Sequence, residues 1–216
     1  MRKRIAICFF GQTRTFQVLN KTYKSLQNDN IEFDFFVSTW DDFRDKSQFD
    51  FCQDREFIDP NIIEFKNNTD RAAYTIHRVN LQKSKYELEH NFIYDYVMWT
   101  RSEVIFKSED LIDFFKEKLI EHTDLEINIH SQLRTDEDEY YYISGDQFFM
   151  GTSLTFDLYS TGWKLYFKRD FDRFQQGRSG GHNFHAYVIN KLPFNLQVRH
   201  IDHILKFQKI DKKDIV

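Results

Sequence analysis

The sequence predicts an α/β fold in which a mostly parallel central sheet is flanked by helices. The main evidence is that short apolar runs, typical of buried strands, alternate along the chain with longer segments whose apolar residues recur at helical spacing. The chain has 216 residues, of which 41% are hydrophobic and 30% charged, an ordinary composition for a globular domain. No internal repeat or low-complexity segment interrupts the pattern. Such an alternation is typical of βαβ units, whose strands are parallel.

The first part of the chain contains two strand signals and one helix signal. Residues 4–10 (RIAICFF) form an apolar run that ends at Gly11, as expected of a strand buried on both faces. Between residues 16 and 26 the apolar side chains recur every three or four positions, which predicts a helix with one buried face. Residues 33–39 (FDFFVST) are the second predicted strand.

The middle of the chain continues the alternation. We expect a weaker strand at 62–65 and a long helix at 70–90, a polar segment without glycine or proline. Residues 94–100 (YDYVMWT) are a further strand signal. Ser108 is a suitable N-cap, because two acidic residues follow it in the first turn of a helix whose buried face reaches Leu119.

The last part of the chain is predicted from weaker signals. Residues 125–129 alternate in polarity as a strand does, and residues 134–139 form a charged loop. The later elements are expected in this order: a strand-like segment at 141–150, a helix at 154–168, a glycine-containing loop at 170–181, a short helix at 183–191, a strand at 195–201 and a basic tail.

Charge and cysteine content exclude several classes of protein. The chain has 34 acidic and 30 basic residues, whereas broad nucleic-acid binding needs a strong basic excess. No apolar run approaches the ~20 residues of a membrane-spanning helix, and the apolar stretch near the start lacks a signal-peptide cleavage site. Cys8 and Cys52 form neither a disulfide framework nor a metal-type pair. We therefore expect a reducing, cytoplasmic location, and a core filled by the abundant Phe and Tyr residues.

Polar loops follow three of the predicted strands, at the edge where α/β sheets bind ligands. In the first loop, Gly11-Gln12-Thr13-Arg14, the glycine allows close approach to a ligand, and the helix start that follows offers free N–H groups to an anion. Arg14 is suited to bidentate phosphate binding. A tight turn with a surface arginine explains the same residues equally well.

The second and third loops add carboxylates and an arginine. Asp41 follows the second strand, where an acid accepts hydrogen bonds from a ribose or a base edge, although it also suits a turn. Arg101 and Glu103 follow the strand at 94–100 and are two residues apart, so in extended chain they point to the same side. This pair suits a diphosphate with its divalent cation, and a salt bridge at the strand end is the alternative.

Three further candidates lie later in the chain. Asp146 is surrounded in sequence by aromatic residues, and an unpaired buried charge is costly, so we expect it to face a cleft as a general base. A turn acid beside Gly145 is the alternative. His182 and His185 are three residues apart and would share a helix face, where they would ligate a metal together with a carboxylate. A histidine without such a role is the commoner case.

The order of these loops resembles that of small bacterial and phage glycosyltransferases of the GT-A type, especially the lipopolysaccharide- and capsule-associated group. The shared pattern spans about three quarters of the chain, although each motif alone is weak. It consists of Ile5 to Arg14, Phe35 to Asp41, Tyr94 to Glu103, and Gly145 to Gly151 leading into a helix.

The resemblance implies one Rossmann-like GT-A domain over residues 1–216, with a nucleotide-sugar-binding half at 1–107 and an acceptor and catalytic half at 108–216. It implies transfer of a sugar from a UDP- or GDP-sugar, with UDP favoured, to a hydroxyl of a glycan or small-molecule acceptor. It also implies a Mn²⁺ or Mg²⁺ ion at an Asp-x-Asp-like element, here 101–103. The residues it assigns are Gly11, Gln12, Thr13, Arg14, Asp41 and Arg101 to the donor, Glu103, His182 and His185 to the metal, and Asp146 to catalysis.

The sequence departs from the family at this metal element. Residues 101–103 read Arg-Ser-Glu, so one acid is present where the family has two. A non-catalytic module that binds a nucleotide or a sugar therefore stays open as an alternative. A nucleotidyltransferase would share the α/β architecture, but the glycine- and lysine-rich loop on which that class relies is not found.

Overall fold

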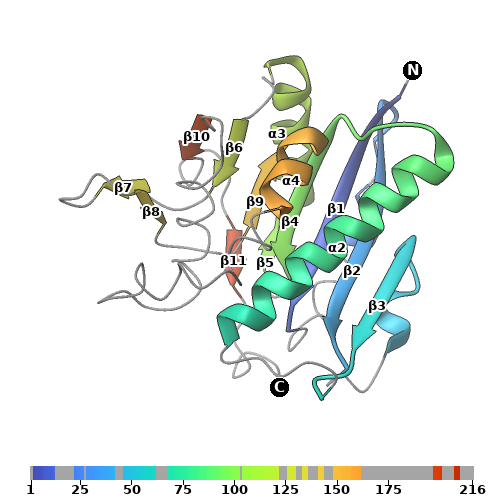
Figure 1. The fold of residues 1–216 in the computed structure, drawn as a ribbon. Coiled ribbons are helices and arrows are strands. Elements are labelled where there is room, and N and C mark those ends of the chain that lie inside the picture. Colours follow the sequence, from blue (N-terminus) through green and yellow to red (C-terminus); the bar gives the residue numbers. More distant parts are fainter. Residues whose placement is uncertain are drawn as a thin grey trace.

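A seven-stranded sheet forms the centre of the computed structural model of this chain (Figure 1). The structure describes residues 2–12, 22–26, 28–41, 46–61, 68–102, 104–121, 126–129, 133–135, 141–143, 148–161, 197–200 and 207–209. From one edge to the other, the strands are β10 (Gln197–His200), β6 (Glu126–Ile129), β9 (Phe148–Gly151), β4 (Tyr96–Arg101), β1 (Lys3–Gly11), β2 (Ile31–Trp40) and β3 (Asp54–Ile58). All of them run in one direction except β9, which is antiparallel to both neighbours. The predicted α/β class with a mostly parallel sheet is confirmed.

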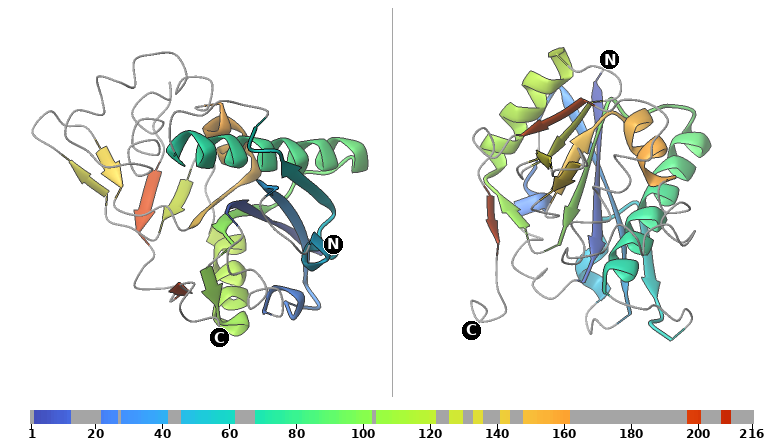
Figure 2. Two further views of the ribbon diagram at one scale, coloured as in Figure 1. Left: turned by 90° about the horizontal axis from the view of Figure 1, so that it is seen from below. Right: turned by 60° about the vertical axis from the view of Figure 1, so that its left-hand side comes forward.

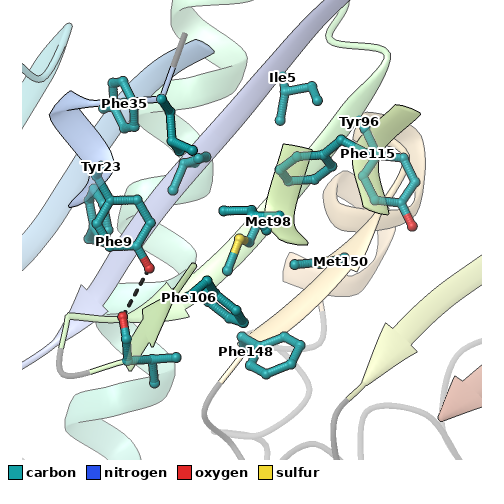
Figure 3. Close-up of a cluster of buried hydrophobic side chains, with 14 of the residues drawn as sticks. Ile5, Phe9, Tyr23, Phe35, Tyr96, Met98, Phe106, Phe115, Phe148 and Met150 are labelled. Carbon is teal, nitrogen blue, oxygen red and sulfur yellow. Dashed lines mark hydrogen bonds between the residues drawn. The ribbon is translucent and has the colours of Figure 1, made fainter. Parts of the chain in front are cut away.

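Helices cover both faces of this sheet. Figure 2 shows α3 (Ser108–Glu121) on one side, and α2 (Asn68–His90) with α4 (Ser153–Ser160) on the other. Side chains of β1 alternate between these layers. Ile5, Ile7 and Phe9 join the core under α3, which Figure 3 shows, whereas Ala6, Cys8 and Phe10 join the core under α2 and α4. Because both faces are covered, the strand is apolar from Ile5 to Phe10, as its sequence predicts.

Two further strand pairs and a short helix complete the described elements. They are β5 (Val104–Phe106) with β11 (Phe207–Lys209), β7 (Leu133–Thr135) with β8 (Tyr141–Ile143), and the 3-10 helix η1 (Lys46–Phe49). Among the helices of the described ranges, none is both long enough and apolar enough to cross a membrane.

Most of the element predictions agree with the structure. The strands predicted at 4–10, 33–39, 94–100, 125–129 and 195–201, and the helices predicted at 70–90 and from Ser108, are all found. The segment 141–150 divides into β8 and β9, which belong to different sheets, and β7 extends into the predicted charged loop. Ser108 is the first residue of α3 rather than its cap, because the Leu111 N–H donates to the Lys107 carbonyl at 3.1 Å.

The third strand of the sheet was not predicted. It is β3, whereas the weak strand signal at 62–65 lies outside the described residues. Along β3 only Ile58 is buried, so the apolar pattern of an interior strand is missing. The strand is held at the sheet edge by main-chain pairing with β2, which leaves no apolar signature in the sequence. The predictions for 16–21, 162–168, 170–181 and 183–191 also lie outside the described residues.

A buried carboxyl group in β2 should make stability depend on pH. Asp34 is buried and accepts a hydrogen bond from the Tyr94 hydroxyl at 2.8 Å. Burial raises the pKa of Asp34 above its usual value, although this bond and nearby Arg4 oppose the rise. The folded state therefore keeps the proton to higher pH than the unfolded state, and this group's contribution to stability falls as pH rises through that window.

We expect Asp34→Asn to gain stability relative to the natural protein as the pH rises from about 4 towards 7, since asparagine keeps the acceptor and removes the charge. Urea unfolding at several pH values measures this difference. The matched control is Asp29→Asn, which replaces an exposed carboxylate in the turn before β2. A gain for Asp34→Asn that is independent of pH would contradict the prediction.

Candidate functional site

The three predicted loops begin side by side at one edge of the sheet. In the register of the parallel strands, Gly11 at the end of β1 pairs with Thr39 of β2, and Phe10 pairs with Arg101 at the end of β4. The first turns of α2 lie at the same edge (Figure 1). The strand ends that carry the candidate residues therefore converge, as the parallel topology predicts.

The main chain at Gly11 has a left-handed conformation, which suits the tight turn predicted after the first strand. Its φ is +82°, in the left-handed region that favours glycine. The Gly11 N–H donates to Thr75 Oγ1 of α2 at 3.1 Å, and the Gly11 carbonyl accepts from Thr39 Oγ1 at 2.7 Å. Both main-chain groups of this residue are thus held by side chains of neighbouring elements.

A hydrogen bond joins the first and third loops. The Ser102 hydroxyl donates to the Gln12 carbonyl at 2.8 Å, and Ser102 is buried. On the other side of position 103, the Val104 carbonyl accepts a hydrogen bond from the buried Tyr23 hydroxyl at 3.0 Å (Figure 3). Burial raises the pKa of Tyr23, so this hydroxyl stays protonated and remains a donor. The residues on both sides of Glu103 are therefore fixed, while Glu103 itself lies outside the described residues.

Asp41 lies at the end of β2 with its side chain partly in solvent. Its main-chain N–H continues the pairing with β3 by donating to Ile58 at 2.8 Å. The carboxylate is 39% exposed and lies 2.7 Å from Lys46 Nζ of η1. This ion pair is open to water, so its contribution to stability is small. A ligand hydroxyl could therefore compete with Lys46 for the Asp41 carboxylate.

Aromatic and basic side chains border this end of β2. The buried Trp40 ring stacks on Tyr74 of α2, with ring centroids 6.3 Å apart. The Arg71 guanidinium lies over the Trp40 ring at 5.7 Å. These contacts connect the first turns of α2 to the strand end that carries Asp41. Sequence reasoning missed Arg71, Tyr74 and Thr75, because nothing in the helical pattern of 70–90 marks the residues that meet the strand ends.

The similarity of this chain to known proteins is confined to its fold. No protein-family model matches it, and no curated protein matches it. Among solved structures it is similar to a glycosyltransferase involved in the glycosylation of the major capsid of PBCV-1. The alignment covers 99% of this chain and 97% of that one, with a TM-score of 0.52 and 8% sequence identity. The chain shares its fold with a glycosyltransferase.

This likeness in fold covers 99% of the chain rather than one half of it. At 8% identity, the likeness assigns no role to any single residue. The contacts within the structure show which of the candidate residues lie together. Those contacts bring Gly11 and Gln12 together with Ser102, and they place the ends of β2 and β4 beside β1.

Several predicted site residues stay predictions. Thr13, Arg14, Glu103, Asp146, His182 and His185 all lie outside the described residues. In the part of the chain that the structure describes, no three His, Cys, Asp or Glu side chains are grouped so that they could hold a metal ion. The metal site predicted from the sequence therefore depends entirely on residues outside that part.

Proposed function

We propose that this chain is a glycosyltransferase of the GT-A type that transfers a sugar from a nucleotide-sugar donor to a hydroxyl acceptor. The proposal has UDP-sugar as the favoured donor, GDP-sugar as the second choice, and a glycan or small molecule as the acceptor. The observation that carries it is the likeness in fold to the PBCV-1 capsid glycosyltransferase over 99% of the chain. The loops that resemble the family's in sequence also begin at one edge of the sheet, which supports the same conclusion.

The donor would bind at the ends of β1, β2 and β4. Gly11 and Gln12 would line the diphosphate side with Thr13 and Arg14, and Asp41 would accept hydrogen bonds from the ribose or base. Arg101, at the end of β4, would pair with a phosphate. The register that places Arg101 beside Phe10, one residue before Gly11, supports a shared phosphate site for the two loops.

The direction of β9 supports the proposed catalytic role of Asp146. Because β9 is antiparallel to β4, it begins where β4 ends, and Phe148 pairs with Thr100. Asp146 precedes Phe148 by two residues and Glu103 follows Thr100 by three. The end of β4 and the start of β9, which these two residues adjoin in sequence, therefore lie at the same edge of the sheet. We propose that Asp146 takes the proton of the acceptor hydroxyl in an inverting reaction, or orients the sugar in a retaining one.

We propose Glu103, His182 and His185 as the residues that hold a divalent cation. Carboxylate and imidazole ligands suit Mn²⁺, and Ser102, which precedes Glu103 in the chain, donates a hydrogen bond to Gln12 of the first loop. When bound, Mn²⁺ or Mg²⁺ supplies positive charge to the leaving diphosphate. Arg14 and Arg101 would add fixed positive charge to the same group.

A thermal-unfolding screen tests the donor site. We expect one of UDP, GDP and CMP, or the corresponding sugar nucleotides, to stabilise the protein by about 2.7 kcal/mol at 100 times its Kd, with a larger effect in Mn²⁺. Glu103→Ala should remove the Mn²⁺-dependent part, whereas the control Glu109→Ala, at the exposed start of α3, should keep it.

An assay for release of the nucleotide from the sugar donor that stabilises the protein then distinguishes an enzyme from a non-catalytic binding module. Release that requires Asp146 supports the enzyme. Binding without release under any acceptor would favour the non-catalytic module, and the absence of any nucleotide shift would overturn the proposal.

A further inference from the structure

Three buried hydroxyl groups hold the main chain where β1 ends. They belong to Thr39 of β2, Thr75 of α2 and Ser102 of the turn after β4, and we refer to them as the hydroxyl clamp. Each of the three residues is 0% exposed. All three bind main-chain atoms of two consecutive residues, Gly11 and Gln12.

The direction of each hydrogen bond in the clamp is determined. Thr75 donates its own hydroxyl hydrogen to the Ala72 carbonyl at 2.9 Å, so its oxygen is free to accept from the Gly11 N–H. Thr39 donates to the Gly11 carbonyl, and Ser102 donates to the Gln12 carbonyl. Three main-chain groups of the first loop are therefore satisfied by side chains that come from distant parts of the sequence.

The three bonds fix the loop with respect to the rest of the site. They tie Gly11 and Gln12 to β2, which Asp41 follows, to the helix that carries Arg71 and Tyr74, and to the turn that precedes Glu103 in sequence. Thr13 and Arg14, which are proposed for phosphate binding, follow Gln12 directly in the sequence. A loop that is ordered before its ligand arrives loses less entropy on binding.

We propose that Thr39, Thr75 and Ser102 are positioning residues, which tighten nucleotide binding by holding Gly11 and Gln12 in the conformation that the donor requires. In this proposal they do not contact the substrate, and they act only through the main chain of Gly11 and Gln12. The proposal rests on the proposed donor site, and it adds to that site three residues to which the sequence assigned no role.

The test compares two substitutions of Thr75. Thr75→Val keeps the shape and removes the hydroxyl, which leaves the Gly11 N–H without its acceptor, whereas Thr75→Ser keeps the hydroxyl. We expect the valine variant to raise the Kd for UDP, or for whichever nucleotide the natural protein binds, about tenfold by titration calorimetry. We expect the serine variant to stay within about twofold. In turnover, the valine variant should raise the donor KM by a similar factor and leave kcat unchanged.

A second pair of variants separates positioning from a general loss of stability. Ser102→Ala should weaken nucleotide binding as Thr75→Val does, because it frees the Gln12 carbonyl. Thr155→Val is the matched control, since Thr155 is equally buried and its hydroxyl lies 3.0 Å from that of Thr152 in the cap of α4, away from the loop. It should lower the melting temperature without changing the nucleotide Kd.

The outcomes distinguish this proposal from the function on which it rests. If the natural protein binds no nucleotide, both are overturned. If it binds one and Thr75→Val and Ser102→Ala bind it equally well, only the role of the clamp is overturned. The same holds if Thr75→Ser loses as much affinity as Thr75→Val, or if Thr155→Val weakens binding to the same extent. Should Thr75→Val fail to fold, Ser102→Ala and Thr155→Val decide between the same outcomes.

Discussion

Replacing Lys83 with methionine should lower the free energy of unfolding by about 3–5 kcal/mol, because it removes the positive charge from a buried ionic network. Lys83 lies in α2 and is 0% exposed. Its Nζ lies 2.8 Å from Glu87 and 3.0 Å from Asp157 of α4, and it also donates to the Ser153 hydroxyl. Methionine fills the same space but leaves both carboxylates without their cation.

Most of the cost should arise at Glu87, since it is the more deeply buried of the two acids. Glu87 also accepts from the Ser153 hydroxyl at 2.7 Å and from the Tyr94 main-chain N–H at 2.8 Å. The network therefore joins α2, the start of α4 and the segment that leads into β4. Loss of its centre should loosen the helical layer that covers this face of the sheet.

Urea unfolding measures the effect, and the same helix provides a matched control. Lys85 is 65% exposed and lies 3.7 Å from Glu89, so Lys85→Met should change stability by no more than about 0.5 kcal/mol. Equal costs for the two substitutions would contradict the prediction. The same would follow from a cost below about 1 kcal/mol at Lys83.

Replacing Gly151 with alanine should cost about 3 kcal/mol, at the upper end of the range for overpacking. Gly151 lies at the end of β9, where it pairs with Val97 of β4 and Ile127 of β6. A Cβ atom there would lie 2.6 Å from the Glu126 main-chain oxygen and 3.3 Å from the Phe156 ring. The oxygen belongs to the adjacent strand, so relief requires a shift of the sheet itself rather than of a flexible side chain.

Gly11→Ala is the natural comparison, because the two glycines are needed for different reasons. At Gly11 a Cβ would meet no atom within 4 Å, and only the left-handed φ opposes it. The expected cost is about 1–2 kcal/mol. Chemical unfolding of both variants checks the order, and a Gly151→Ala protein as stable as the natural one would contradict the packing argument.

The sequence by itself determined the fold class and the elements of the sheet interior. β1, β2 and β4 were predicted because strands covered by helices on both faces contain runs of apolar residues, and this signal is local. α2 was predicted from its length without glycine or proline. The order of polar loops after these strands was sufficient to place Gly11, Asp41 and Arg101 at one edge, because parallel strands end on the same side.

Only the tertiary structure decided the features that depend on distant partners. β3 was missed because an edge strand is held by main-chain hydrogen bonds, which any side chain permits. The antiparallel direction of β9, which places its first residue, Phe148, beside Thr100 near the end of β4, depends on how the chain crosses the sheet. Lys83 lies on a helix that is polar in sequence, and its burial follows from the packing of α4 against α2.

The hydroxyl clamp shows the same division within the candidate site. Gly11 was singled out because a glycine after a strand is visible in the sequence. Thr39, Thr75 and Ser102 are ordinary residues in sequence, and they gain their role from hydrogen bonds to Gly11 and Gln12 across the fold. Local patterns record which face of an element is buried, whereas the partner of a buried polar group is determined only when the elements pack together.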